Sequence, residues 1–361
     1  MSVCAVIYGC AQQQETQQGR VAQVAREEFF NYTVHFCAEE DCMKLVAAEL
    51  IAATESVNCA FYGLSNGLLH ELVQAHNITT HNITNVESLR QVQMPVQIRI
   101  VVDSKAPMSE SYVEDGIVHR YKGLGIMHNK YCVLDNRTVL TGSFNPTATA
   151  AAKTKRDYNN LLIINSTTLA AFYQKDFQGL ANQRPRPQAA KGAQGARTIR
   201  TIRTITGNIV MLNGTAVEAY FCPENSCAAA IIRELRKANG SIAFAAYSFT
   251  SAEIANELII KASQGVNVSG IIEHSTAGSK YSKHNALAAN SVNVKLENSK
   301  KLMHHKFFVI DGSVVITGSF NPTENADKRN AENIIIIKNR QIAGKYDEEF
   351  NRIKSLTELP A

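Results

Sequence analysis

The sequence of 361 residues predicts an α/β protein built from two similar halves, and three observations lead to this fold class. The first is an internal repeat, in which FCAEEDC at residues 36–42 recurs as FCPENSC at 221–227, and MHNKYCVLDNRTVLTGSFNPT from Met127 recurs as MHHKFFVIDGSVVITGSFNPT from Met303. The second is an alternation of strand-like and helix-like segments within each copy. The third is a polar, basic stretch between the copies. Together they predict two repeated units joined by a linker.

Each unit is expected to follow the same order of elements. A short strand ends near the first cysteine of the repeat, and helical spacing of apolar residues follows, as in Leu45, Val46 and Leu50. Buried strands are predicted at 57–62 and 242–247 and at 96–102 and 266–272, with helices at 68–75 and 252–262 between them. The long repeated segment predicts a two-stranded hairpin. A strand at 160–164 or 333–337 and a helix at 168–180 or 341–354 close each unit, so helices should cover both sheet faces.

Charge marks the joint between the units. The chain has 37 Lys and Arg against 32 Asp and Glu, a net charge of +5, and six basic residues lie between Arg184 and Arg203 without any acidic residue. That stretch is rich in Pro, Gly, Ala and Gln, which is typical of a linker. We therefore expect a leader resembling a shortened signal at 1–30, a first domain at 31–183, a basic linker at 184–205 and a second domain at 206–361. A hydrophobic content of 45% excludes a disordered protein, and no apolar run is long enough for an integral membrane segment.

The candidate active-site residues occur once in each half. His128 and Lys130 are two residues apart, as are His304 and Lys306, so on a strand each pair points to one face. Each pair is followed by a GSFN segment that brings a hydroxyl and an amide to the same place. Lysine, amide and hydroxyl donors suit an anionic tetrahedral centre, and two histidines can supply one nucleophile and one acid near neutral pH. We therefore predict phosphoryl chemistry, with a phosphate-binding role for Ser143, Asn145, Ser319 and Asn321.

Two copies of H-x-K-x4-D-x6-G-S-x-N resemble the phospholipase D superfamily, and the resemblance extends over both halves outside the linker and the first 30 residues. It implies two domains, each a mixed β-sheet flanked by helices, packed about a pseudo-twofold axis so that both motifs meet in one pocket. It also implies cleavage of a phosphodiester through a covalent phosphohistidine, with His128 as nucleophile and His304 as acid. The sequence near the motifs contains no cluster of carboxylates that could hold a metal ion. We therefore expect metal-independent chemistry without a cofactor.

The resemblance further implies that a nearby carboxylate or amide steadies each histidine. Glu332 stands where nuclease-like members carry that carboxylate, whereas the first half has Asn159 at the matching position after a three-residue insertion. This asymmetry leaves the choice of nucleophile open. Asp135 and Asp311 each enter a tight turn, so a structural role is expected for both rather than a catalytic one.

The cysteines form a second repeated pattern. Cys37 with Cys42 and Cys222 with Cys227 share the spacing C-x4-C, which favours two disulfides over free thiols or a four-thiolate zinc site. Cys59 and Cys132 are expected to be core thiols within strands. Disulfides and glycosylation sequons favour an exported or cell-surface location over the cytoplasm.

The sequence indicates the reaction class more directly than it indicates the substrate. The compact unit around each motif and the segment AENIIII favour a phosphodiesterase acting on nucleic acid. A phospholipase D that hydrolyses phospholipid headgroups, or a phosphatidyl transferase, is the alternative, and a non-catalytic nucleic-acid-binding module is a more remote one. The two halves together should make a monomer with a pseudo-dimeric active site.

Overall fold

The computed structural model describes residues 24–27, 31–76, 95–147, 157–182 and 207–357. The expected linker and most of the expected leader lie outside these residues, so the domain boundaries stay a prediction. Val24–Glu27 lies inside the expected leader, but it forms a strand, β1, that pairs in parallel with β9 of the second half. The first half therefore lends one strand to the sheet of the second.

The first half supplies a seven-stranded mixed sheet with the order β2-β8-β7-β6-β3-β4-β5. Its strands are β2 (Asn31–Phe36), β3 (Ser56–Phe61), β4 (Gln97–Val102), β5 (Val118–Arg120), β6 (Lys130–Leu134), β7 (Thr138–Gly142) and β8 (Asn160–Asn165). The helices that accompany it are α1 (Cys42–Ala52), α2 (Asn66–Ala75), α3 (Glu110–Glu114) and α4 (Thr167–Ala181). The only parallel neighbours in this sheet are β3 with β4 and β4 with β5, as helical crossovers between them require.

The second half repeats this sheet strand for strand and extends it with β9 and β1, in the order β1-β9-β10-β16-β15-β14-β11-β12-β13. Its strands are β9 (Asn208–Leu212), β10 (Thr215–Cys222), β11 (Ser241–Ala246), β12 (Asn267–Glu273), β13 (Asn293–Glu297), β14 (Lys306–Ile310), β15 (Val314–Gly318) and β16 (Glu332–Ile337). Its helices are α5 (Cys227–Leu235), α6 (Ala252–Ser263), α7 (His274–Ala277), α8 (His284–Ala288), α9 (Glu324–Lys328) and α10 (Arg340–Thr357). The predicted fold class, two repeated α/β units with mixed sheets, is confirmed.

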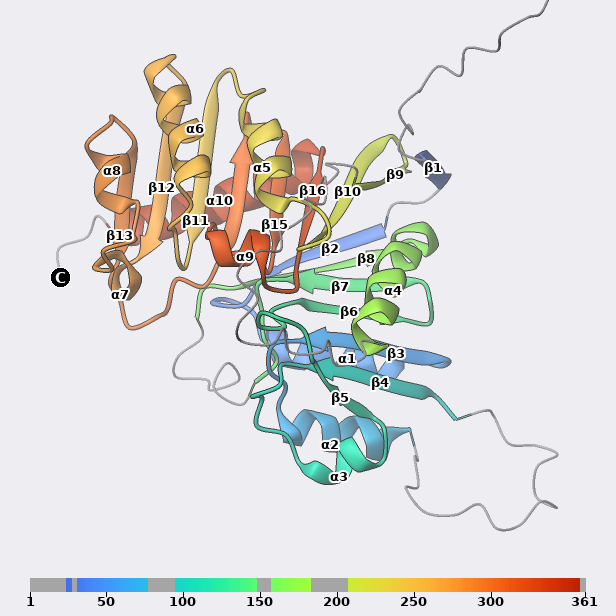
Figure 1. The fold of residues 1–361 in the computed structure, drawn as a ribbon. Coiled ribbons are helices and arrows are strands. Elements are labelled where there is room, and N and C mark those ends of the chain that lie inside the picture. The colour runs from blue at the N-terminus through green and yellow to red at the C-terminus, as the bar shows by residue number, and fades with distance from the viewer. Residues whose placement is uncertain (1–23, 28–30, 77–94, 148–156, 183–206, 358–361) are drawn as a thin grey trace, which may run out of the picture.

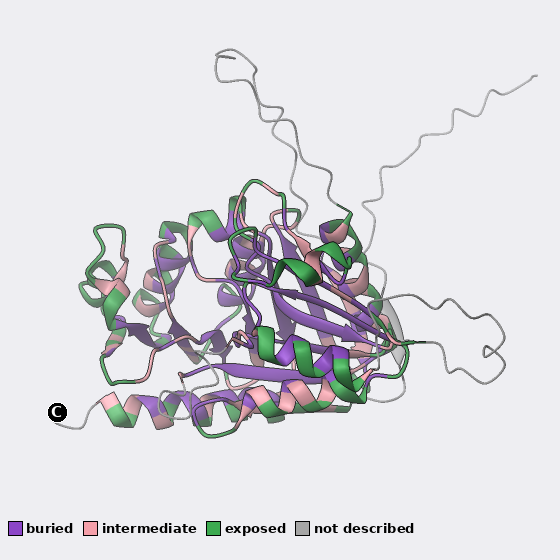
Figure 2. Ribbon diagram, turned by 90° about the horizontal axis from the view of Figure 1, so that it is seen from below, coloured by how far each residue is buried: buried purple, intermediate pink, exposed green. Residues whose placement is uncertain are grey.

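The two sheets are held together by a shared apolar layer. One buried cluster combines residues of both sheets with the inward faces of α4 and α10, including Tyr173, Phe177, Tyr346 and Phe350. Separate clusters lie on the outer face of each sheet, one beneath α1 and α2 and the other beneath α5 and α6. Figures 1 and 2 show the resulting arrangement, with buried strands between the helices. Because α4 and α10 each contact strands of the opposite half, the halves form one body.

Tight turns fix the hairpins that carry the motifs. Asp135 and Asp311 adopt positive φ angles of 51° and 50° at the β6–β7 and β14–β15 turns. Each carboxylate accepts three main-chain N–H groups, those of residues 54–56 for Asp135 and of residues 239–241 for Asp311. These bonds lower the pKa of both carboxyls although burial acts in the opposite direction. The geometry thus ties each hairpin to the loop before β3 or β11, in keeping with the structural role expected for the two aspartates.

Three disulfides connect described residues. Cys37 is bonded to Cys42 and Cys222 to Cys227, in the pairs that the spacing suggested. The prediction of core thiols for Cys59 and Cys132 was wrong, because these residues are bonded to each other. They are directly opposite on the antiparallel strands β3 and β6, with their Cα atoms 4.1 Å apart. Their spacing of 73 residues hides this contact until the strand order is known.

Candidate active site

Both histidines lie where the two halves meet. The segment before β6 reaches the second half, where the main-chain N–H of His128 donates to the carbonyl of Ala331 at 2.8 Å. Its counterpart before β14 reaches the first half, where the N–H of His304 donates to the carbonyl of Tyr158 at 3.0 Å. Two parallel bridges, Met127 to Ala331 and Tyr158 to Met303, flank these bonds. The chain therefore presents each histidine from one half against the other.

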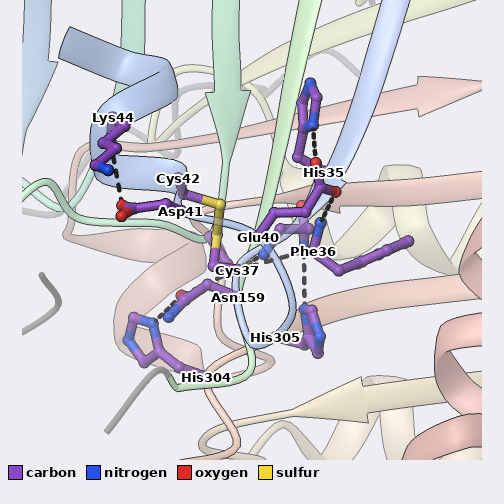
Figure 3. Close-up of a disulfide and its surroundings, with 12 residues drawn as sticks. His35, Phe36, Cys37, Glu40, Asp41, Cys42, Lys44, Asn159, His304 and His305 are labelled. Carbon is purple, nitrogen blue, oxygen red and sulfur yellow. Dashed lines mark hydrogen bonds and ion pairs between the residues drawn. A yellow bond between two sulfur atoms is a disulfide. The ribbon is translucent and has the colours of Figure 1, made fainter. Parts of the chain in front are cut away.

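The orienting groups are exchanged between the halves. His128 Nδ1 lies 2.7 Å from Glu332 Oε2, and His304 Nδ1 lies 2.7 Å from Asn159 Oδ1. An oxygen acceptor at this distance requires a proton on Nδ1, so the Nε2 atom of each neutral ring keeps its lone pair. Figure 3 shows the His304–Asn159 contact beside the Cys37–Cys42 disulfide. The N–H of Cys37 donates to the carbonyl of Asn159 at 2.8 Å, so this disulfide loop supports the orienting residue.

The serines of the two GSFN segments contact the orienting groups. Ser319 Oγ donates to Glu332 Oε2 at 2.6 Å, and Ser143 Oγ donates to Asn159 Oδ1 at 3.0 Å. Both serines are completely buried. The structure therefore places their hydroxyls behind the histidines, not at an open phosphate site as the sequence analysis supposed.

A glycine before each serine allows this close approach. Gly142 and Gly318 both have φ of 145°, and a Cβ on either would lie 2.3 Å from a carbonyl oxygen of the neighbouring strand. Such a contact is far shorter than any real one, so a side chain would push the serine away from its partner.

The asparagines of the GSFN segments are arranged differently from the serines. The Oδ1 atoms of Asn145 and Asn321 are buried and make no hydrogen bond with any described residue. Unpaired buried polar atoms are uncommon in folded proteins and often mark sites that meet a ligand. The unpaired atoms are hydrogen-bond acceptors, which a phosphodiester oxygen cannot satisfy, so phosphate binding by the Nδ2 hydrogens of Asn145 and Asn321 stays a prediction.

Four basic groups share the site with one carboxylate. Lys130 Nζ donates to the carbonyl of His128 and Lys306 Nζ to that of His304, both at 2.8 Å. Burial lowers the pKa of Lys130 to about 7, against the opposing attraction of Glu332. Burial and the charge of Lys130 hold the pKa of Lys306 well below its usual range. These mutual effects show that both motifs act on one electrostatic centre.

The histidine pKa values follow the same pattern. Burial lowers the pKa of His128, and the charge of Glu332 offsets part of that effect. Burial and the charges of Lys306, Lys130 and His128 hold the pKa of His304 well below its ordinary value. Burial acts to raise the pKa of Glu332, but His128, Lys130 and Ser319 lower it overall. A buried site with this excess of basic groups gains by accepting an anion.

Several supporting residues were missed by the sequence analysis. Asp103 and Glu273 accept the main-chain N–H groups of Met127 and Met303 at 2.9 and 2.8 Å, which fixes the approach to each histidine. Both carboxylates end a buried parallel strand, a repeated placement that could have been noticed. Tyr62 and Tyr247 lie edge-on to His128 and His304, with ring centroids 5.5 and 5.3 Å apart. The described residues contain no group of three or more His, Cys, Asp or Glu arranged to hold a metal ion.

Comparison with known proteins agrees with this geometry. The family described as "Cardiolipin synthase, PLD-like domain" matches residues 74–181 and 231–354, which is more than half of the chain. This chain belongs to the phospholipase D superfamily. The prediction of a phosphodiester hydrolase of that superfamily is confirmed at the level of reaction class.

Individual relatives match one part of the chain each. A protein named phospholipase D from Rickettsia conorii is 37% identical over 139 residues, which is 38% of this chain and 70% of that protein. A mitochondrial cardiolipin hydrolase from Xenopus tropicalis is 35% identical over 119 residues, 33% of this chain and 57% of that protein.

One solved structure resembles nearly the whole chain. The phosphatidylserine synthase of Haemophilus influenzae has a TM-score of 0.65 at 13% identity and covers 93% of this chain and 88% of its own. At that identity the likeness shows the two-unit fold alone.

No described helix is both long and apolar enough to cross a membrane.

Proposed function

We propose that the protein hydrolyses a phosphodiester through a covalent phosphohistidine formed on His128. The observation that carries this proposal is the exchange of orienting groups, which pairs His128 with the carboxylate of Glu332 and His304 with the neutral amide of Asn159. When Nε2 of His128 bonds to phosphorus, the ring becomes positively charged. A carboxylate 2.7 Å from Nδ1 stabilises that charge, whereas an amide does so far less. The asymmetry that left the nucleophile open thus favours His128.

The reaction has two balanced steps. In the first, Nε2 of His128 attacks phosphorus while protonated His304 gives its Nε2 proton to the departing oxygen. In the second, His304 takes a proton from water, whose oxygen attacks phosphorus and breaks the P–N bond. Lys130 and Lys306 neutralise the charge on the equatorial oxygens, and Asn145 and Asn321 donate amide hydrogens to them.

The negative charge of the substrate favours the protonated form of His304 that the first step requires. In the free protein, burial and mutual repulsion lower the pKa values of His304 and Lys306. A phosphodiester anion between these groups has the opposite effect and raises them. Substrate binding is therefore accompanied by proton uptake, so His304 is protonated when the leaving oxygen needs a proton. Ser143 and Ser319 act as positioning residues for Asn159 and Glu332.

For the substrate, the surface before His128 now favours a phospholipid over the nucleic acid expected from the sequence. Leu124 and Ile126 are 74% and 40% exposed, four and two residues before the nucleophile. Exposed apolar side chains at that place suit an acyl or interfacial environment. The names of the two relatives, phospholipase D and cardiolipin hydrolase, support the same class. Nucleic acid remains the second candidate because Lys300 and Lys301, the repeat counterparts of Leu124 and Gly125, add positive charge before His304.

The test uses purified protein in EDTA with three labelled substrates: mixed phospholipid vesicles, single-stranded DNA and RNA. We expect headgroup release that EDTA does not abolish and that is lost in His128→Ala and His304→Ala, while the exposed His70→Ala control retains it. Full activity in either active-site variant would refute the paired-histidine scheme. Nucleic-acid cleavage without headgroup release would transfer the same chemistry to the second substrate class. Complete loss in EDTA would refute metal independence.

A further inference from the structure

A cavity outside the active site lies at the junction of the halves, between α4 and the loop that follows β10. It has a volume of about 430 Å³. Phe172, Phe221 and Pro223 provide apolar walls, and Asp176 and Glu224 provide two carboxylates. Figure 1 shows α4 beside the ends of β9 and β10, which it also contacts. None of these residues belongs to the paired motifs.

The internal repeat gives this cavity a counterpart in the other half. The alignment that matches Asn159 with Glu332 also matches Asp176 with Glu349 on the closing helices α4 and α10. The same alignment matches Tyr158 with Ala331 and Arg352 with Gly179. From the cysteine repeat, Glu39 corresponds to Glu224. Asp176, Gly179, Glu224 and Ala331, which line the cavity, can therefore be compared with their equivalents.

In the counterpart, side chains fill the space. Arg352 bonds to Glu349 through Nε at 2.8 Å and to Glu39 through a terminal nitrogen at 3.1 Å. Its guanidinium lies 5.7 Å from the centre of the Tyr158 ring, and that ring stacks on His305 at 6.5 Å. A cation and an aromatic ring thus occupy this site together, held by two carboxylates.

The open copy keeps the carboxylates but lacks both fillers, because Gly179 and Ala331 replace the arginine and the tyrosine. Asp176 accepts one hydrogen bond, from the Tyr131 hydroxyl at 2.6 Å. Among the described residues neither Asp176 nor Glu224 forms an ion pair, although Lys175 also lines the cavity. Asp176 is half-buried and Glu224 is exposed, so both carboxylates remain available to a cation that enters the cavity from solvent.

We propose that this cavity binds a small organic cation, an ammonium or guanidinium group carried on an aromatic body. The cation lies between Asp176 and Glu224, as Arg352 lies between Glu349 and Glu39. The aromatic body fills the volume that Tyr158 occupies in the other copy. The protein thereby gains a ligand site that is separate from the phosphodiester site.

The protonation of Asp176 gives the site a pH dependence. Burial raises its pKa to about 7, the Tyr131 hydrogen bond opposes this, and the charge of Glu224 adds to it. The other titratable groups nearby are Tyr173 and Lys175 from α4 and Tyr121, which also lines the cavity. A cation binds the ionised carboxylate, which is about one-tenth populated at pH 6 and nine-tenths at pH 8. We expect roughly tenfold tighter binding at pH 8, with proton release near pH 6.

Isothermal titration with tyramine, which carries an ammonium group on a phenol ring, tests the site on the full chain. Agmatine supplies a cation without a ring, and 4-methylphenol supplies the ring without a cation. We expect tyramine to bind more tightly than either and Asp176→Asn to weaken it at least tenfold. Equal affinity for tyramine and 4-methylphenol, or no tyramine binding up to 10 mM at pH 8, would overturn the proposal.

The variant Gly179→Arg restores the residue that fills the counterpart. A Cβ at Gly179 meets no other atom within 4 Å, so the fold should accept it. Gln178→Arg is the matched control, because it adds the same charge on the same helix at an exposed position that does not line the cavity. We expect Gly179→Arg to abolish tyramine binding and to raise the thermal midpoint above that of the control. Unchanged tyramine affinity in a folded Gly179→Arg protein would show that the cation does not occupy this place.

Discussion

Replacing Lys130 by methionine should stabilise the fold while abolishing activity. Lys130 is 1% exposed, and burial lowers its pKa from 10.5 to about 7. The unfolded chain therefore binds more protons than the folded protein between these two pH values, and stability rises with pH across that window. Below pH 7 the cost of the buried charge is fully present, and above pH 10.5 it vanishes.

The size of this effect follows from the pKa difference. Each pH unit is worth about 1.4 kcal/mol, so the lysine costs roughly 5 kcal/mol at pH 7 and roughly 2 kcal/mol at pH 9. Methionine removes this cost but leaves the carbonyl of His128 without its donor, a loss of about 1–2 kcal/mol. Lys130→Met should therefore be more stable than the parent by roughly 3 kcal/mol at pH 7 and about equally stable at pH 9.

Urea denaturation of both proteins at several pH values between 7 and 9 measures this difference. Lys261→Met is a useful control, because Lys261 is also buried and donates to a carbonyl, that of Ala238, outside the active site. Phosphodiesterase activity of Lys130→Met should fall at least a hundredfold, because the charge on the equatorial oxygens loses a partner. A stability difference that does not change with pH would refute the buried-charge reasoning.

Three further outcomes follow from the same contacts. Glu332→Gln retains a hydrogen-bond acceptor for His128 Nδ1 but loses the negative charge, so kcat should fall roughly 10²–10³-fold. Near-normal turnover would argue against His128 as the nucleophile. Asn159→Asp places a carboxylate beside His304, so the pKa of His304 should rise and the basic limb of the pH–rate profile should move to higher pH. An unshifted profile would show that His304 does not transfer the proton. Asp311→Ala removes three hydrogen bonds outside the site, so stability should fall by about 1–2 kcal/mol with kcat unchanged, and lost turnover in the folded variant would contradict the structural role.

The repeat made most of the fold predictable from sequence. Strand alternation and the duplicated motif were enough to place His128 and His304 on equivalent hairpins, and positive-φ turns at Asp135 and Asp311 agree with the turn chemistry expected there. Periodicity reports which face of a strand is buried, and it does so within each half separately. That is why the sequence predicted both the two-unit architecture and the residues that make up each motif.

Contacts between the halves could not be predicted in the same way. Periodicity places Glu332 on a buried face but does not say that its partner is His128, 204 residues away in the other unit. The Cys59–Cys132 bond depends on β3 pairing with β6, which only the strand order reveals. Ser143 was assigned to phosphate because hydroxyls suit that anion, yet its bond to Asn159 becomes visible only when β7 and β8 are adjacent. Strand order and the packing of the halves decided each of these cases.

The most direct test of the account is to locate the phosphoryl group on the enzyme. In His304→Ala, Nε2 of His128 should still attack a phosphodiester with a good leaving group such as p-nitrophenolate, because that departure needs little acid. The variant should lack the base that activates water in the second step. Rapid quenching in alkali, digestion and mass spectrometry would then identify the modified residue. The account predicts an accumulated, acid-labile phosphoryl adduct on His128. Absence of an adduct on His128 in His304→Ala, together with an adduct on His304 in the reciprocal His128→Ala variant, would contradict it.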